Sequence, residues 1–168
     1  MRRKDCPAEF IKECMAQALF QIMQTKKFED VTISEICKVA GFGRTTYYHY
    51  FTNRTEELIS YYLNKKWSEK VPVFHEGDDG VEWIKVILNA YYLYREQLTL
   101  LYKQGLLEIA LDVTYKGVQK TYSVNNHPYF AAWVAGALYG VIREWVKGSF
   151  NVTPDELVDT VKSTFCKN

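Results

Sequence analysis

Aromatic and hydrogen-bonding side chains are concentrated between residues 43 and 54, in the segment GRTTYYHYFTNR. The segment holds five successive rings between two cations: Arg44, Tyr47, Tyr48, His49, Tyr50, Phe51 and Arg54. Side chains on a helix point in all directions, so these rings cannot all face one core. Rings with polar tips and flanking cations suit a partner that is anionic and accepts hydrogen bonds.

The residues before this segment predict a short helix that ends in a tight turn. Thr32 is placed to cap a helix over ISEICKVA, and Glu35 completes a capping box three residues later. Gly41 follows where helices commonly end in a left-handed residue, and Gly43 is an acceptable cap for the next helix. Two short helices joined by a glycine-containing turn are typical of a helix-turn-helix.

The second helix of such a unit enters the DNA major groove, with its N-terminal residues nearest the base edges. Arg44, Thr45 and Thr46 hold those positions. Arginine commonly reads guanine, and a threonine methyl can pack on the methyl group of thymine. The pattern therefore predicts contacts between this end of the helix and bases or phosphates.

The aromatic residues that follow are expected to divide between two faces. Tyr47 and Phe51 are four residues apart and share a face, so we expect them in the core. Tyr48, His49 and Tyr50 can direct N–H or O–H groups at phosphate oxygens. The alternative is that the rings only pack against a neighbouring domain. For Tyr48 and Tyr50 the flanking cations make such a dry interface costly.

The rest of the chain reads as helices, with almost no strand pattern. An amphipathic helix is expected from Pro7 to about residue 24, and one long helical pattern, straight or bent, covers residues 81–105. The apolar segment YFAAWVAGALYGVI is too short to span a bilayer. The net charge is only +1, but residues 1–66 carry 11 basic and 8 acidic side chains, so the basic half surrounds the aromatic run. From the helical patterns and the near absence of strand patterns, we predict an all-α protein.

The segment VTISEICKVAGFGRTTYYHYFTNRTEEL resembles the helix-turn-helix of TetR-family transcriptional regulators. The matching positions are Thr32, Ile36, Ala40, Gly41, Thr46, Tyr48, Tyr50, Phe51 and Asn53. With the preceding amphipathic helix, the resemblance covers about the first 60 residues. The segment AGALYGVIREWVKGSFNVTPDEL is similar to the last two helices of TetR-family regulators from Firmicutes.

The resemblance implies a three-helix DNA-binding domain, expected at residues 1–52, and a helical effector-binding and dimerisation domain at residues 53–168. In the family, one set of positions commonly touches phosphates: Thr32, Thr46, Tyr48, Tyr50 and Arg54. Another set commonly faces bases: Ser34, Arg44 and Thr45. The expected function is a dimeric repressor that binds a palindromic operator in double-stranded DNA and is released by a small molecule. Gly43 departs from the usual serine cap, Arg54 from the usual lysine, and NRTEEL is one residue longer than usual, so the junction with the fourth helix could be shifted.

Two surfaces are expected in the second domain. The family dimerises through its last two helices, and the apolar residues there suit such an interface: Trp133, Gly136, Ala137, Gly140 and Trp145. Tyrosines with apolar bodies and polar tips suit a pocket for a small apolar or aromatic effector, and they suit an ordinary core as well. The candidate ligand-binding residues are Trp83, Tyr91, Tyr94 and Tyr122.

Other functional classes find less support in the sequence. There is no nucleophile motif, phosphate loop or HExxH, and no cysteine–histidine cluster with zinc spacing, so we expect neither an enzyme nor a metal or cofactor site. The charged N-terminus lacks the pattern of a signal peptide, and a cytoplasmic location without membrane contact is expected. A helical dimeric adaptor without operator-specific DNA binding remains the alternative.

Overall fold

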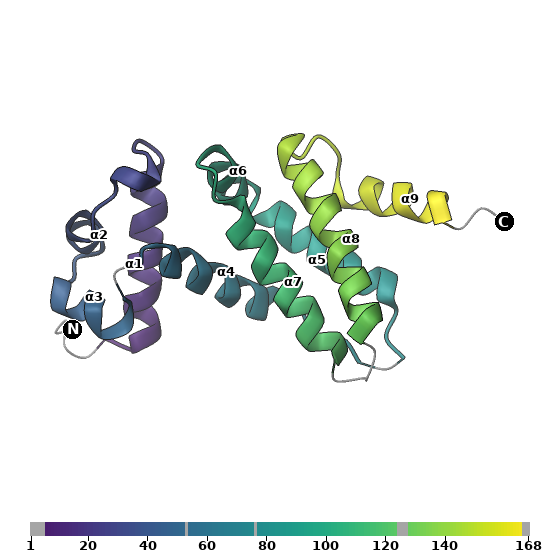
Figure 1. Ribbon diagram of the computed structural model, residues 1–168, viewed down its shortest axis with the longest axis horizontal. Coiled ribbons are helices and arrows are strands. Elements are labelled where there is room, and N and C mark those ends of the chain that lie inside the picture. Colours follow the sequence, from purple (N-terminus) through teal and green to yellow (C-terminus); the bar gives the residue numbers. More distant parts are fainter. Residues whose placement is uncertain (1–5, 53, 76, 124–127, 166–168) are drawn as a thin grey trace. The chain divides into compact units, whose positions relative to one another are not determined.

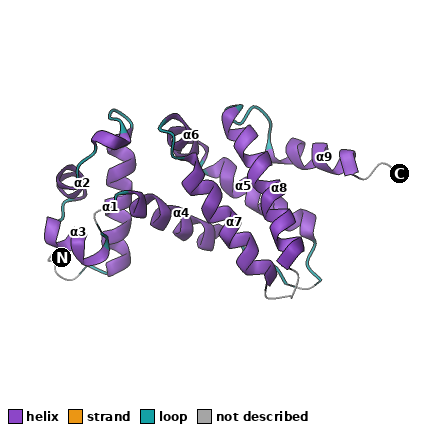
Figure 2. Ribbon diagram, in the orientation of Figure 1, coloured by secondary structure: helices purple, strands orange, loops and turns teal. Residues whose placement is uncertain are grey.

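The computed structural model describes residues 6–52, 54–75, 77–123 and 128–165, and this part of the chain is built from helices and loops only (Figure 2). The predicted all-α fold is confirmed. The helices in chain order are α1 (Ala8–Met23), the 3-10 turn η2 (Phe28–Asp30), α2 (Ile33–Ala40), α3 (Arg44–Tyr50), α4 (Glu56–Lys70), α5 (Gly80–Leu93), α6 (Arg95–Lys103), α7 (Leu107–Ser123), α8 (Pro128–Lys147) and α9 (Pro154–Phe165). Among the described residues, no helix is both long and apolar enough to cross a membrane.

The chain forms two compact units, residues 1–64 and residues 65–168. The predicted domain boundary, between residues 52 and 53, lies inside the first unit. The first unit continues to residue 64 because the start of α4 packs into its core. Leu58 and Ile59 are fully buried there, and the ring of Tyr62 lies 4.8 Å from that of Phe20.

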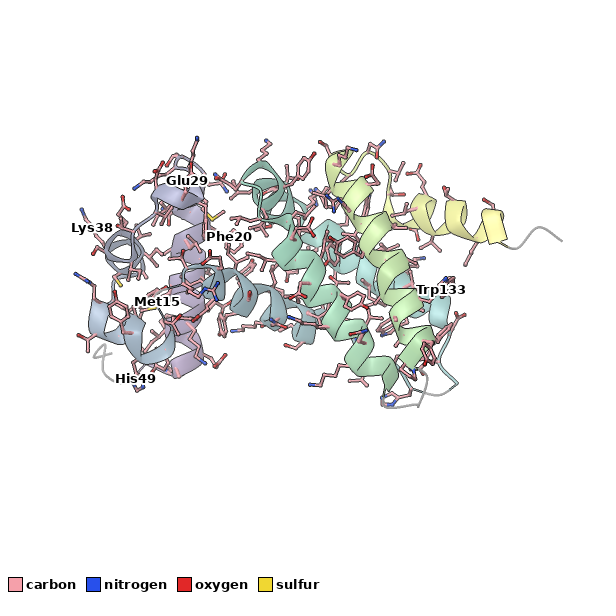
Figure 3. All side chains as sticks on the ribbon, viewed as in Figure 1. Met15, Phe20, Glu29, Lys38, His49 and Trp133 are labelled. Atoms are coloured by element: carbon pink, nitrogen blue, oxygen red, sulfur yellow. The ribbon has the colours of Figure 1, made fainter. Side chains whose placement is uncertain are left out.

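The first unit is built around α1, which packs against α2 (Figure 1). Its buried residues recur at four-residue steps, Ile11, Met15 and Leu19, so one face of the helix forms the core (Figure 3). Phe10 is 51% exposed and does not belong to this core. Ile36 of α2 completes this core.

In the second unit, α7 and α8 run side by side over most of their length, and α9 packs against α5 (Figure 1). The long pattern over residues 81–105 is two helices, α5 and α6, which meet at Tyr94. The backbone of Tyr94 has φ −102° and ψ 21°, outside the helical range, while its N–H still donates to Tyr91 O at 3.1 Å. Backbone hydrogen bonds therefore continue across the junction although the helix is interrupted at Tyr94. The apolar periodicity of the sequence does not predict this interruption.

Close packing between α4 and α7 depends on one glycine. A Cβ atom on Gly117 would lie 2.7 Å from Cε2 of Trp67. Real Cβ atoms do not approach another atom so closely. The side chain of Trp67 therefore occupies the space that any other residue at position 117 would need.

Candidate nucleic-acid interface

The turn between α2 and α3 forms as the sequence predicts. Thr32 accepts a hydrogen bond from Glu35 N, and the Glu35 carboxylate accepts one from Thr32 N at 2.9 Å, which completes the capping box. Gly41 ends α2 with φ 76°, a left-handed conformation that glycine adopts without steric cost. Gly43 is the N-cap residue of α3 and makes no side-chain cap bond.

Two aromatic rings anchor α3 to the core, one within the helix and one at the residue directly after it. Tyr47 is fully buried, Phe51 is 8% exposed, and their ring centroids lie 5.6 Å apart. Phe51 also meets Tyr61 of α4, with 6.0 Å between the centroids. The predicted inward placement of Tyr47 and Phe51 is confirmed. It fixes the rotation of α3 about its own axis and hence which residues face solvent.

The opposite face of α3 is open to solvent. Arg44, Thr45, Tyr48 and His49 line an open hollow there with a volume of about 660 Å³. Tyr48 is 44% exposed although it carries a large ring. The face thus presents a guanidinium, a threonine hydroxyl, a phenol and an imidazole together, a set of groups that can donate to base edges and phosphate oxygens.

The other predicted DNA-binding residues differ in their exposure. Ser34 and Arg54 are exposed, whereas Thr46 and Tyr50 are half-buried. The ring of Tyr50 lies 4.7 Å from that of His49, centroid to centroid. That these side chains bind DNA stays a prediction. All of them are at least partly exposed, so none is prevented by burial from reaching a partner.

The hydrogen-bond donors of Thr32 already have a partner within the protein. Its hydroxyl donates to Glu35 Oε2 at 2.7 Å, and its backbone N–H donates to the same oxygen. Lys26 also donates to Glu35, at 2.8 Å, and these bonds hold the pKa of the Glu35 carboxyl down to about 2. A phosphate at Thr32 would have to compete with a carboxylate. The tie between Lys26 and Glu35 was not predicted, because the two residues are nine positions apart and in different elements.

The predicted ligand-binding residues differ in burial and in their hydrogen bonds. Trp83 is buried and donates from Nε1 to Pro72 O at 2.8 Å. Tyr91 is buried too. Its hydroxyl donates to Ala110 O at 3.1 Å and bonds to Thr114, and burial raises its pKa. Tyr94 is half-buried at the junction of α5 and α6, and the side chain of Tyr122 lies outside the described residues.

The predicted dimer residues mostly share one exposed face of α8. Trp133 is 62% exposed (Figure 3). Gly136, Ala137 and Gly140 of the same helix are exposed as well. Trp145 departs from the prediction: it is 3% exposed, and its Nε1 donates to Val152 O at 3.0 Å. Its ring stacks on Tyr92 at 5.8 Å, so it belongs to the core of its own chain.

An apolar groove of about 570 Å³ runs along this face of α8, between α5 and α9. Its α5 wall is formed by Val81, Ile84 and Leu88, which were not among the predicted residues. Their three- and four-residue spacing marks one helix face, but it does not distinguish an open groove from a filled core. Lys162 of α9 is the one charged residue among those that line it.

The comparisons with known proteins agree with a regulator in general terms. No family model matches the chain. The chain is 27% identical over 88 residues to the HTH-type dhaKLM operon transcriptional activator DhaS of Lactococcus lactis, and the match covers 52% of this chain and 45% of that protein. The aligned part is thus less than half of that relative. The similarity supports a transcriptional regulator of the helix-turn-helix type.

Proposed function

We propose that the protein binds double-stranded DNA sequence-specifically, with α3 in the major groove, and regulates transcription by binding rather than by catalysis. The observation that carries the proposal is the division of α3 into two faces. Tyr47 and Phe51 hold it to the core, while Arg44, Thr45, Tyr48 and His49 line the outward hollow together. The similar Lactococcus protein is itself described as a transcriptional activator of an operon.

Selection of bound duplexes from a random pool tests this proposal. The unmodified protein should enrich a defined sequence. Arg44→Ala should relax the preference at one base pair, at a cost of about 1–3 kcal/mol, because arginine reads a base through paired hydrogen bonds. Lys27→Ala removes an equal charge next to Glu29, which lies at the opposite end of the unit from His49, and should leave the enriched sequence unchanged (Figure 3). Recovery of no preferred sequence by the unmodified protein would favour the adaptor alternative.

Dimerisation through α8 is the second part of the proposal, and the exposed apolar face supports it. Gly136 and Gly140 have nothing within 4 Å of where a Cβ would stand. Glycine inside a helix costs up to about 1 kcal/mol relative to alanine, and no contact among the described residues requires a glycine at either position. A second copy that packs closely on the groove accounts for both the glycines and the exposed Trp133. A two-fold dimer also predicts an operator with two-fold symmetry.

Repression and release by an effector form the third part of the proposal. A dimer bound over a promoter excludes polymerase without needing a contact surface for it. The proposed effector is a small apolar or aromatic molecule that binds near Trp83, Tyr91, Tyr94 and Tyr122. The hydroxyl of Tyr91 is bonded to α7, so a ligand that uses this hydroxyl has to displace those bonds. A reporter gene behind the selected operator tests the direction of regulation: deletion of the regulator should raise expression.

A further inference from the structure

Three side chains extend the outward surface of α3 onto α1 and α4. Lys12 of α1 donates to Glu9 Oε1 at 2.9 Å, and Tyr61 of α4 donates to Glu9 Oε2 at 2.7 Å. Lys12 Nζ lies 5.8 Å from the ring centroid of Tyr50 and 5.4 Å from that of Tyr61. The ring of Tyr50 in turn meets His49. The cluster is therefore continuous with the proposed DNA-facing residues and lies within the first unit.

The donors of this cluster are of the kind that bind phosphate. Lys12 offers an ammonium and Tyr61 a phenol O–H, and both are directed at the two oxygens of one carboxylate. A phosphodiester also presents two anionic oxygens that accept such bonds. The rings of Tyr50 and Tyr61 lie against the ammonium of Lys12 and limit where it can point. The Glu9 carboxylate is thus bound by donors that also suit a phosphate.

The ion pair between Lys12 and Glu9 is open to water. The side chain of Glu9 is 60% exposed and that of Lys12 is 26% exposed. An ion pair this accessible to water contributes little to stability, so its replacement by a phosphate costs the fold little. Phosphate binding also releases a condensed counterion from DNA, which favours the exchange at low salt.

We propose that Lys12 and Tyr61 form a phosphate-binding site beside α3, and that Glu9 occupies this site when no DNA is bound. The inference rests on the proposed DNA binding. Glu9 acts as an internal competitor: it does not read sequence, and it lowers affinity for every duplex by the same factor. The chain thereby weakens non-specific and specific binding together, while Arg44 and Thr45 keep their contribution to preference.

The test measures binding of the full chain to the selected operator and to a random-sequence duplex over a series of salt concentrations. Glu9→Gln should tighten binding to both duplexes alike, by about 2- to 5-fold, the scale of one exposed ion pair. Lys12→Met should weaken both and reduce the slope of log K against log salt by about 0.9, the value for one phosphate contact. Tyr61→Phe should weaken both without changing the slope, because the phenol carries no charge.

Three controls separate the site from a general effect of charge or folding. Glu9→Gln should tighten nothing in the Lys12→Met background, Lys12→Arg should keep the salt slope, and Glu29→Gln, at the far end of the unit from His49, should leave binding unchanged (Figure 3). Equal tightening by Glu9→Gln with and without Lys12, or an unchanged slope in Lys12→Met, would overturn the site while leaving DNA binding intact. If the unmodified protein binds neither duplex, the proposed function and the site both fail.

Discussion

Tyr47 combines an anchoring role with an unsatisfied polar atom. Its ring is fully buried, yet no described residue offers its hydroxyl a hydrogen-bond partner. Burial raises the pKa of this phenol to about 12, so the hydroxyl stays neutral throughout the physiological range. A buried hydroxyl without a partner loses its hydration and gains nothing in return.

Replacement of Tyr47 by phenylalanine should therefore stabilise the protein. The ring contacts with Phe51 and Tyr48 remain, and the desolvated oxygen is removed. We expect the free energy of unfolding to rise by about 1 kcal/mol in urea denaturation. Tyr47→Leu, which also removes the oxygen but loses the ring, should destabilise and serves as the comparison. A loss of stability in Tyr47→Phe would mean that the hydroxyl has a partner such as a bound water.

At the scale of the element, the start of α2 depends on a single carboxylate. Glu35 receives bonds from Thr32 and Lys26, and its pKa in the folded chain is about 2, against an ordinary value of 4.5. Because folding lowers the pKa of Glu35, its ionised carboxylate stabilises the folded chain fully at pH values above the ordinary pKa of 4.5. This stabilisation is lost as the pH falls from there toward 2.

Acid titration of stability should reveal this carboxylate. The free energy of unfolding of the unmodified protein should fall between pH 5 and pH 2 more steeply than that of Glu35→Gln. At pH 7 the variant should be the less stable of the two, and the difference should close toward pH 2. Parallel curves would show that Glu35 does not contribute through its charge.

The contact between α4 and α7 gives a second prediction at this scale. Gly117→Ala places a methyl group against the indole of Trp67, so we expect a loss of about 1–3 kcal/mol in unfolding free energy despite the better helix propensity of alanine. The smaller ring in Trp67→Phe makes room for the methyl group. In that background, Gly117→Ala should therefore lower the unfolding free energy by less than it does in the unmodified protein. If Gly117→Ala proves neutral in urea denaturation, the indole can move at little cost.

Local signals predicted the elements better than they predicted the surfaces. The capping box of Thr32, the left-handed Gly41 and the inward pair Tyr47 and Phe51 all depend on residues within a few positions of one another, and all three formed as expected. Trp145, predicted at the dimer interface, is buried within its own chain, where its ring stacks on Tyr92 of α5. The groove and the pair Lys26–Glu35 likewise arise from contacts between distant residues, which periodicity does not encode.

At the scale of the whole molecule, the exposed face of α8 predicts the oligomeric state. Gly140→Asp places a charge where we propose that a second copy packs, so it should yield monomer in sedimentation velocity at micromolar concentration, where the unmodified protein should be a dimer. Asn89→Asp adds the same charge at an exposed position of α5 that does not line the groove, and it should leave the dimer intact. An unmodified protein that sediments as a monomer contradicts the proposal directly.

The two-faced character of α3 has a consequence for how such a protein can diversify. The residues that hold the helix in place, Tyr47 and Phe51, are separate from those that face outward, Arg44, Thr45 and His49. Exchange of the outward residues removes no described contact with the hydrophobic core, so substitutions there change the stability of the fold little. A duplicated gene could drift toward a new target sequence through single substitutions, each of which leaves a folded product for selection to act on.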